Sequence, residues 1–546
     1  MNFKTITPET YQKLHRLHGG GSFWNRVVTG TDERVEILVG LGLCGEPVVI
    51  AEIAQYLLVS QGAVQRATRA AIQQLMVQIP PVRLAELDYR VREVGSHQPY
   101  EQDVWRQLKP GDLPHLAEGE HAISVLGLAS FHASGHVREA AIRLLAERKD
   151  GIAVSYLLLR LNDWVEPVRR LARQTLQKWL TPAYAPHFLA NLPLVLRLEL
   201  CGRAEHTDFV QSVAKLLRSP ECRDLLLQNA ATGDRATRRA CLRLATEGEE
   251  AGRLSILRSA LDDSDSLIRF WSARRLLPDV GLEELPRLSA ALVRDSFMPV
   301  RREALQALAG RLPAQATTPL RHALLDGHAS IRETARYYLK EQSGFDASTF
   351  YRVSLRDAKG PKLAAAIRGL GETGGREDRQ LMGPFLAAKE ARLRKAAIGA
   401  LARLAPEQSA EIFLKFLSAD EPTVSQEACT ALLPRARFIA ASTLAVILGR
   451  EARPVVRKNA LKLVLRLGKW ERLPLLLTSS GDSDEKLAQM AKAGVNAWWS
   501  RYNRSYAQPT PEQLAEAKAA LTANATKLSV GLASEIGVIL DGWNKK

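Results

Sequence analysis

Four histidines lie close together in the first quarter of the chain and could, by composition, ligate a metal ion. They are His115, His121, His132 and His136, with Glu118 and Glu120 between them. Imidazole and carboxylate groups bind zinc or iron when three or four of them converge. The segment between His132 and His136 reads Ala-Ser-Gly, which is typical of a turn, and the spacing matches no standard ligand pattern. The sequence therefore predicts no metal site and no cofactor.

A glycine run near the amino terminus is the second candidate for chemistry. The stretch "LHGGGSFWN", residues 17–25, resembles the oxyanion loop of lipases, but no GxSxG nucleophile motif accompanies it. The chain also lacks a GxxxxGK[ST] phosphate loop and a strand-flanked GxGxxG. We interpret Gly19 to Gly21 as a flexible joint, and we expect no catalytic residues, no small-molecule substrate and no enzyme activity.

Basic side chains are the third candidate, because Lys and Arg contact phosphates and carboxylates through charge-assisted hydrogen bonds. Within "RKNALKLVLRLGKWER" the spacing i, i+4, i+8, i+11 predicts one wholly cationic face on one helix. The candidate polyanion-binding residues are Arg170, Arg239, Arg243, Arg274, Arg302, Lys395, Lys458, Lys462, Arg466, Lys469, Arg501 and Arg504.

Aromatic side chains follow this cationic segment in "NAWWSRYNRSY". Trp498, Trp499 and Tyr502 alternate there with Arg501 and Arg504. Aromatic planes beside arginines suit base stacking combined with phosphate contact. The alternative is that the tryptophans close the hydrophobic end of the fold while the charges keep it soluble.

The positive charge is concentrated toward the carboxy terminus. The chain has 75 Lys and Arg against 59 Asp and Glu, a net charge of +16. Residues 1–130 hold 12 basic against 14 acidic residues, whereas residues 435–504 hold 14 against 5. Such a local excess indicates an acidic partner.

Bulk composition indicates a globular protein. Of the 546 residues, 46% are apolar and 25% charged. No apolar run approaches the length of about 20 residues that a membrane helix needs, and the opening residues have no secretory h-region. The five cysteines are scattered and form no CxxC pair. We expect a cytoplasmic protein without a membrane partner, and the Ala, Leu and Arg richness favours a bacterial source.

An internal repeat explains how such residues are positioned. An aliphatic residue recurs at intervals of 31 or 32 residues or close multiples of that, frequently with an acid five residues before it and an arginine directly after it. Small and aliphatic residues follow at helical spacing, so each repeat is a helix, a short turn and a second amphipathic helix. The main anchors are Val137, Val168, Ile268, Val300, Ile331, Leu393, Val424 and Val456, with weaker copies at Val64, Thr237, Leu363 and Leu487.

This pattern resembles the HEAT repeat family, particularly its short bacterial form. The segment from Leu370 to Gly374 resembles the inter-repeat turn of phycobilisome-lyase-type units. The resemblance implies an all-α, right-handed α-α superhelix of the HEAT/armadillo type. It also implies that the arginine after each anchor pairs with turn acids between adjacent repeats, and that second helices line a concave surface. This series of arginine–acid pairs, the ladder, is expected to break at Ala364, Ser425 and Ala488, where the arginine is missing.

The expected organisation has six segments. They are an amino-terminal cap and joint (1–44), divergent helical repeats (45–130), a HEAT-like solenoid (131–340), an insertion (341–362), a strongly basic HEAT-like solenoid (363–505) and a carboxy-terminal helical cap (506–546). In the last segment Thr510, Pro511 and Gln513 have the pattern of a capping box. Residues 50–75 could form a helix-turn-helix, but they also fit the repeat with Val64 as anchor, which we favour.

The repeats offer no convergent set of titratable groups, so we expect a non-catalytic interaction scaffold whose basic concave surface binds a macromolecular partner, with a protein partner favoured. The alternative is nucleic-acid binding through phosphate contacts by the basic carboxy-terminal repeats. A remote alternative is a DNA glycosylase resembling the HEAT-like alkylpurine glycosylases, whose catalytic constellation has no match here.

Overall fold

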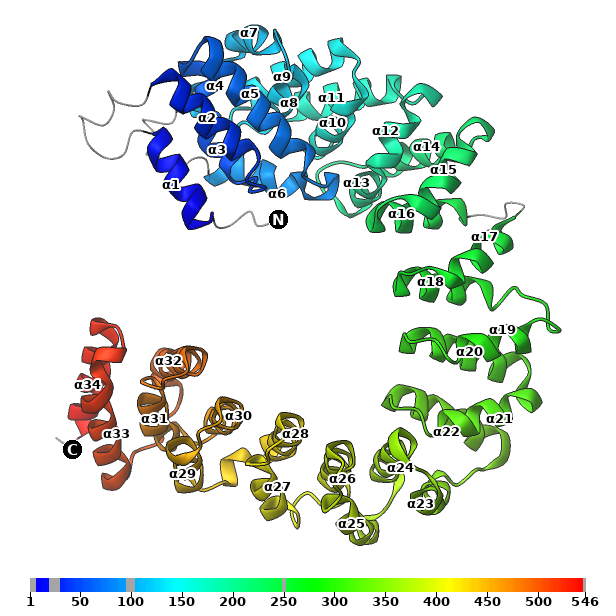
Figure 1. The fold of residues 1–546 in the computed structure, drawn as a ribbon, viewed down its shortest axis with the longest axis vertical. Helices are drawn as coiled ribbons and strands as arrows, with labels where there is room; N and C mark the ends of the chain where they lie inside the picture. Colours follow the sequence, from blue (N-terminus) through cyan, green and yellow to red (C-terminus); the bar gives the residue numbers. More distant parts are fainter. Residues whose placement is uncertain (1–5, 19–29, 95–103, 248–251, 544–546) are drawn as a thin grey trace. The chain divides into compact units, whose positions relative to one another are not determined.

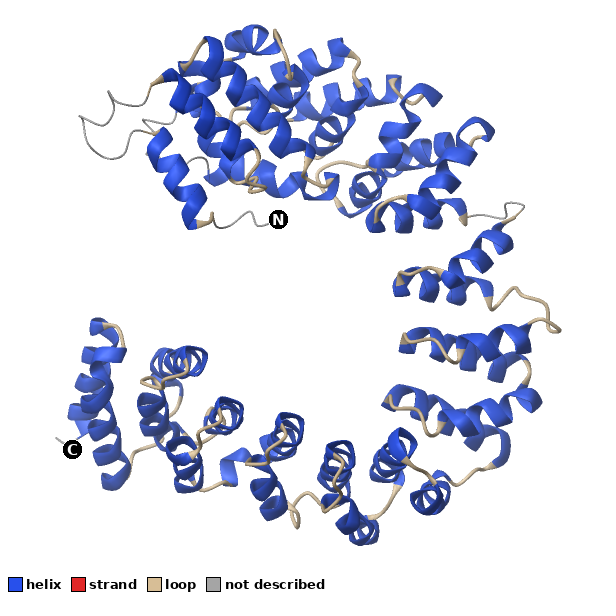
Figure 2. Ribbon diagram, viewed as in Figure 1, coloured by secondary structure: helices blue, strands red, loops and turns tan. Residues whose placement is uncertain are grey.

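The structure is a computed structural model that describes residues 6–18, 30–94, 104–247 and 252–543. Within these ranges the chain is helical and contains no strand (Figure 2). It divides into two compact units, residues 1–268 and 269–546. Short 3-10 turns join many of the helices.

The first unit contains helices of uneven length. Their bounds are α1 (Pro8–Leu17), α2 (Thr31–Gly42), α3 (Val49–Ile53), α4 (Tyr56–Val59), α5 (Gly62–Val77), α6 (Leu84–Tyr89), α7 (Leu113–Ala117), α8 (Ala122–Ala129), α9 (Gly135–Arg148), α10 (Val154–Arg160), α11 (Glu166–Lys178), α12 (Ala185–Ala190), α13 (Leu192–Arg197), α14 (Thr207–Arg218), α15 (Pro220–Thr232), α16 (Arg235–Ala245) and α17 (Arg253–Ser259).

The second unit is built from helix pairs. The first helices are α19 (Leu285–Leu292), α21 (Pro313–Ala323), α23 (Ala347–Asp357), α25 (Gly383–Leu386), α27 (Ala410–Leu417), α29 (Ala441–Arg450), α31 (Lys469–Ser479) and α33 (Pro511–Asn524). The second helices are α18 (Ser266–Leu276), which begins at the end of the first unit, α20 (Met298–Arg311), α22 (Ala329–Ser343), α24 (Gly360–Thr373), α26 (Ala391–Leu404), α28 (Pro422–Leu432), α30 (Pro454–Val464), α32 (Glu485–Ser500) and α34 (Val530–Gly542). From α18 to α32 successive second helices start 31 or 32 residues apart.

The anchors explain why each second helix packs where it does. Val137, Val168, Val300 and Val424 are fully buried, and the other main anchors are also in the core. Burying a Val or Leu side chain stabilises the fold by roughly 1.5–3 kcal/mol. One helix pair exposes too much apolar surface to be stable alone, so neighbouring pairs stack. The predicted all-α solenoid is confirmed.

Arginine–aspartate rungs connect consecutive pairs. Arg301 donates from Nε and Nη2 to both carboxylate oxygens of Asp326, each at 3.0 Å, and from Nη1 to the carbonyl of Asp295 in its own turn at 2.8 Å. Asp326 also accepts from the backbone N–H of His328 at 2.8 Å. Each rung therefore fixes two turns at once. The same pairing joins Arg138 to Asp163, Arg238 to Asp263, Arg269 to Asp295 and Arg457 to Asp482.

The ladder changes where the sequence departs from the repeat. Arg332 bonds Glu372 at the end of α24, and Ala358 stands where several other repeats have the acid of the turn. Ser425 replaces the ladder arginine in α28, and its hydroxyl donates to the Leu417 carbonyl at 2.6 Å and accepts from Asn459 at 3.0 Å. The predicted breaks at Ala364 and Ser425 are therefore confirmed.

Residues 341–362, expected to form an insertion, contain α23, which packs against α24. The spacing of the second helices continues unchanged across them. The other segment boundaries stay predictions.

The last helix pairs close the end of the second unit. The Thr510 hydroxyl accepts from Gln513 N–H at 3.2 Å and the Gln513 side chain accepts from Thr510 N–H at 3.0 Å, so the predicted capping box is confirmed. Helix α33 packs on α31.

All five cysteines are free thiols. Among the described residues, every helix is too short or too polar to span a lipid bilayer. The compartment and the bacterial, phycobilisome-lyase-type form of the repeat stay predictions.

Candidate macromolecular interface

The second helices from α18 to α32 form one row (Figure 1). They lie on the inner side of the curve that the helix pairs of this unit make, with the first helices on the outer side (Figure 1). Helix α20 packs against α22, α24 against α26, α26 against α28, and α28 against α30. Side chains on the solvent face of these helices therefore lie side by side.

Several predicted polyanion-binding residues already have acidic partners. Arg239 holds Asp265 with two bonds of 2.9 and 2.8 Å. Arg243 donates to Glu247 at 2.8 Å and lies 3.5 Å from Glu199. These two arginines are neutralised within the fold, and both belong to the first unit.

Lys395 on α26 lies 3.8 Å from Glu427 of α28. Lys395 is half-buried, so this loose pair only partly offsets its charge.

Other predicted cations make no ion pair with any described residue. On the second unit these are Arg274 on α18, Arg302 on α20, Lys458 and Lys462 on α30, and Arg466, Arg501 and Arg504 in the turns that follow α30 and α32. Arg170 on α11 of the first unit is likewise exposed. The Nε of half-buried Arg302 has no acceptor among the described residues. These side chains retain donors for an external anion.

The cationic face is not carried by one helix, and the sequence-based expectation on this point is wrong. Helix α30 ends at Val464, so it holds Lys458 and Lys462 only. Arg466 lies in the following turn, and Lys469 opens α31. Gly468 lies just before α31, and its N–H donates to the Glu471 side chain at 3.1 Å.

Lys469 has a structural role. Its Nζ donates to the carbonyl oxygens of Tyr502 at 2.8 Å and Ser505 at 3.0 Å, and it lies 3.8 Å from the centroid of the Tyr502 ring. Burial, followed by the nearby charge of Arg472, lowers the pKa of Lys469. It therefore fastens the segment after α32 to α31 and is not a free cation.

Two of the three predicted stacking residues already pack against other aromatic side chains. Trp498 is 1% exposed, packs edge-on against Trp470, and donates from Nε1 to the Lys469 carbonyl at 2.7 Å. Tyr502 packs against both tryptophans, and its hydroxyl accepts from Trp543 Nε1 at 2.7 Å. The prediction that Trp498 can stack on a base is therefore wrong, because other aromatic rings already cover it. Trp499, 40% exposed, keeps a free face.

Sequence reasoning missed two cations of the inner row. Arg403 on α26 is exposed and makes no ion pair with a described residue, and Arg368 on α24 is half-buried. Burial, followed by the charge of Arg332, lowers the pKa of Arg368. The i, i+8 spacing from Lys395 could have identified Arg403, whereas the weak anchor at Leu363 obscured Arg368.

The histidines do not form a metal centre in the described part of the chain, which contains no metal-binding group of His, Cys, Asp or Glu. His132 is buried; its Nε2 lies 2.9 Å from the Trp105 carbonyl oxygen, and its Nδ1 accepts from Ser134 N–H at 3.0 Å. It therefore ties a turn to its neighbour. The glycine run Gly19–Gly21 lies outside the described residues.

The candidate helix-turn-helix has no free recognition helix. In a helix-turn-helix, α5 would have to enter the major groove of DNA. Here it packs against α2 and α8, and its anchor Val64 is buried. This arrangement agrees with the repeat interpretation.

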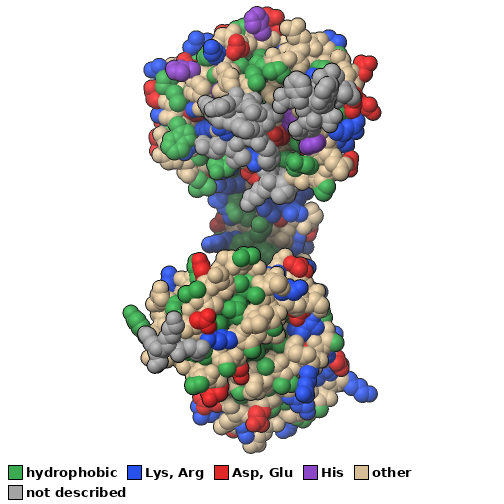
Figure 3. All heavy atoms as spheres, turned by 90° about the vertical axis from the view of Figure 1, so that its left-hand side faces the viewer, with side chains coloured by type: hydrophobic (Ala, Val, Ile, Leu, Met, Phe, Trp, Pro, Cys, Tyr) green, Lys and Arg blue, Asp and Glu red, His purple; other side chains and the backbone are tan. Residues whose placement is uncertain are grey.

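The surface charge is mixed in sign. On the face that Figure 3 presents, Lys and Arg side chains lie among Asp, Glu and apolar ones and do not form one unbroken field.

No protein-family model and no curated protein matches the chain. Among solved structures it is similar to importin beta at 12% identity and a TM-score of 0.35, over 97% of this chain and 84% of that one. It is also similar to the Kap95:Nup1 complex at 12% identity and a TM-score of 0.29, over 91% and 88%. The karyopherin Kap121p bound to the extreme C-terminus of Cdc14p matches at 12% identity and 0.30, over 96% and 65%. Likenesses at these values carry no conclusion about what this chain binds.

Proposed function

We propose that this chain is a non-catalytic interaction scaffold and that the inner row of second helices in residues 269–546 binds an acidic segment of a partner protein. One observation carries the proposal. The ladder arginines of these helices are bonded to acids, whereas Arg274, Arg302, Arg403, Lys458 and Lys462 on the same helices make no ion pair with a described residue. The surplus charge is therefore directed to solvent.

Stacking places these separate cations along one row of helices. Helices that pack side by side lie about 8–10 Å apart, and the Debye length at physiological salt is about 8 Å. Exposed charges on neighbouring second helices are therefore largely screened from one another, and each cation acts mainly through its own contact with the partner. An extended acidic segment crossing the row would meet unpaired cations on α18, α20, α26 and α30, whereas α28 carries no Lys or Arg.

A protein segment suits the surface better than a nucleic acid does. Glu333 and Tyr337 lie exposed on α22 within the same row, and Tyr337 is 60% exposed. A continuous line of phosphates would be repelled by Glu333, whereas a chain that mixes acidic and apolar residues can place an apolar group on Tyr337. The burial of Trp498 also removes one of the expected base-stacking groups.

The experiment compares a labelled peptide of alternating glutamate and leucine with labelled duplex DNA and RNA by fluorescence anisotropy over a salt series. The variant carries Lys458→Glu, Lys462→Glu and Arg466→Glu. We expect the peptide to bind more tightly than either nucleic acid, and the variant to weaken peptide binding by roughly tenfold or more, because three contacts of about 0.5–1 kcal/mol each are reversed in sign.

The matched control changes three exposed cations of the outer first helices, Arg287, Lys415 and Arg450, to Glu. Its net charge is the same as that of the inner-row variant, so general electrostatic attraction falls equally in both. Tighter binding of DNA or RNA, lost in the inner-row variant alone, would make nucleic acid the ligand. Equal losses in both variants would rule out the inner row as a binding surface.

A further inference from the structure

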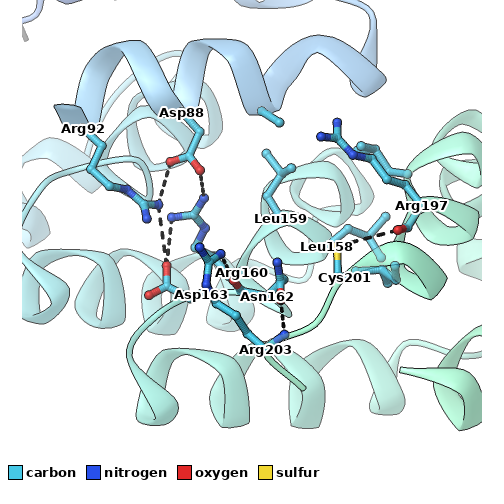
Figure 4. A pocket seen from close by; sticks show the side chains of 13 residues that line it. Asp88, Arg92, Leu158, Leu159, Arg160, Asn162, Asp163, Arg197, Cys201 and Arg203 are labelled. Carbon is cyan, nitrogen blue, oxygen red and sulfur yellow. Dashed lines mark hydrogen bonds and ion pairs between the residues drawn. The ribbon is translucent and has the colours of Figure 1, made fainter. Parts of the chain in front are cut away.

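A cavity of about 200 Å³ lies within the first unit, apart from the inner row. Side chains from α6, α10, α13 and the adjoining turns line it, together with the short helix η3 (Arg90–Val94) (Figure 4). Its charged lining consists of Arg92, Arg160, Arg197, Arg203, Asp88 and Asp163. Arginines therefore outnumber carboxylates around a small, partly open space.

The carboxylates of Asp88 and Asp163 both accept hydrogen bonds from buried or half-buried arginines. Arg160, 1% exposed, donates from Nη2 to Asp88 at 2.5 Å and from Nη1 to Asp163 at 3.0 Å. Arg92 donates to the second oxygen of Asp88 at 2.8 Å, and Arg138 holds Asp163 with bonds of 2.9 and 2.7 Å. Three guanidinium groups thus share two carboxylates, which leaves one positive charge in excess.

Two donors of this network remain unused. The Nε atoms of Arg92 and Arg160 are buried and have no acceptor among the described residues. Burial, followed by the charge of Arg160, lowers the pKa of Arg92. Buried donors without acceptors and a buried excess charge both favour an anion in the adjacent space.

The rim of the cavity adds two exposed arginines. The guanidinium of Arg203 lies 3.9 Å from the centroid of the Trp164 ring and donates to the Asn162 carbonyl at 3.1 Å, so its orientation is held. Arg197 makes only a long contact of 3.5 Å with the Val82 carbonyl. Neither makes an ion pair with any residue in the described part of the chain.

Leucines supply the remaining wall. Leu158, Leu159, Leu194 and Leu198 line the same cavity. A bare inorganic ion would leave this apolar surface in contact with water, whereas an anion with a short hydrocarbon part would cover it.

We propose that this cavity binds a small organic anion, a carboxylate or phosphate group attached to a short apolar chain. The guanidinium groups of Arg197 and Arg203 receive the oxyanion at the rim, because their planar donor forks match carboxylate and phosphate oxygens. The leucines receive the hydrocarbon. The site is independent of the inner row, so its ligand does not depend on which macromolecule that row binds.

Cys201 provides a probe inside the cavity. It lines the space and is half-buried, and its Sγ lies 3.6 Å from the Arg197 carbonyl oxygen. Cys44, also half-buried, does not line the cavity, while the other three cysteines are buried. Alkylation of each thiol by anionic iodoacetate and by neutral iodoacetamide can be followed by peptide mass spectrometry. The ratio of the two rates reports the local potential, because both reagents attack the same thiolate.

We expect this rate ratio to be higher at Cys201 than at Cys44. The double variant Arg197→Gln, Arg203→Gln should lower the ratio at Cys201 by roughly threefold to tenfold, which is the effect of two charges a few ångströms away in partly aqueous surroundings. The matched control is Arg66→Gln, Arg170→Gln, which removes two exposed arginines of the same unit that do not line the cavity. It should leave the ratio unchanged.

Protection identifies the ligand chemistry. Octanoate, acetate, octyl phosphate and inorganic phosphate are tested at constant ionic strength for their ability to slow iodoacetamide at Cys201. We expect octanoate or octyl phosphate to protect Cys201 at lower concentration than acetate or inorganic phosphate, which lack the chain. Whichever of octanoate and octyl phosphate protects at the lower concentration identifies the preferred oxyanion as a carboxylate or a phosphate. Equal rate ratios at Cys201 and Cys44, an unreactive Cys201, or no protection by any anion would overturn the proposal.

Discussion

Each ladder aspartate serves two repeats. Asp295 accepts from Arg269 of the preceding second helix with two bonds of 2.8 Å, and from the Phe297 N–H of its own turn at 2.7 Å. Both side chains of the pair are mostly buried. Removing the negative charge takes away the carboxylate that Arg269 bonds with two guanidinium N–H groups, in partly desolvated surroundings.

Asp295→Asn should therefore lower the free energy of unfolding by about 2–3 kcal/mol, since the amide keeps the turn contact but loses the charge-assisted pair. Urea denaturation followed by circular dichroism measures it. The control Glu139→Gln breaks the exposed pair with Arg143 and should change stability by less than about 0.5 kcal/mol. Equal effects of the two changes would contradict a stabilising role for the rung.

The same residue predicts an acid dependence. The bonds from Arg269 lower the pKa of Asp295 below its ordinary value of 3.8, although burial opposes this. Its contribution to stability is therefore complete above that ordinary value and is lost as the pH falls through the lower folded-state pKa. The stability difference between the wild-type chain and Asp295→Asn should shrink steadily below about pH 4, and urea midpoints across this range check it. A difference that stays constant down to the acid transition would show that the rung is not ionic.

At the scale of the elements, close helix packing depends on glycine at particular places. Gly371 lies in α24, where an added Cβ would meet the Cα of Ala400 in α26 at 2.5 Å. Helices α24 and α26 pack tightly because this pair of positions is small. Gly310 in α20 has nothing within 4 Å of the position its Cβ would take.

The two glycines should respond in opposite directions to alanine. Gly371→Ala should lower the free energy of unfolding by about 1–3 kcal/mol, because the helices must move apart. Gly310→Ala should raise it by about 0.5–1 kcal/mol, because alanine restricts the unfolded chain without a clash. Thermal and urea unfolding of both variants test this. A gain in stability from Gly371→Ala would show that α24 and α26 adjust freely.

On the scale of the whole molecule, stability is a sum of neighbouring interfaces. Each second helix of the row packs on the next along the chain, so a local defect has few routes to distant elements. We expect Gly371→Ala to speed amide hydrogen exchange in α24 and α26 while leaving α2 and α5 of the first unit unchanged. Hydrogen–deuterium exchange with mass spectrometry resolves these helices. A uniform increase along the chain would indicate a single cooperative fold.

The internal repeat made the helix pairs and the contacts between them predictable from the sequence. The anchors recur at a regular interval, with an arginine after and an acid before in most repeats, and chain connectivity alone brings consecutive repeats together. Arg301 and Asp326, for example, are 25 residues apart, and any stacking of successive helix pairs makes them neighbours. The pairing of the rungs, the burial of the anchors and the capping box at Thr510 follow from this local order.

The candidate interface was less predictable, because the spacing of residues does not indicate which side chains are already bonded or packed within the fold. Lys469 has helical spacing from Lys458, yet α30 ends at Val464 and two carbonyls after α32 bind the ammonium group of Lys469. Trp498 reads as a stacking residue, but Trp470 and Tyr502 cover it. Whether Trp498 is exposed or buried depends on how α31, α32 and the turn after α32 pack together.

The amino-acid sequence by itself determined the helix pairs, their interval and the ladder, since these need only contacts between neighbouring repeats. The tertiary structure alone decided which cations stay unpaired and where a cavity forms. Asp88 and Arg160, 72 residues apart, meet across a gap that no repeat interval predicts. Contacts of that kind depend on which faces of irregular helices come together, and this is set by packing throughout the first unit and not by any local pattern of residues.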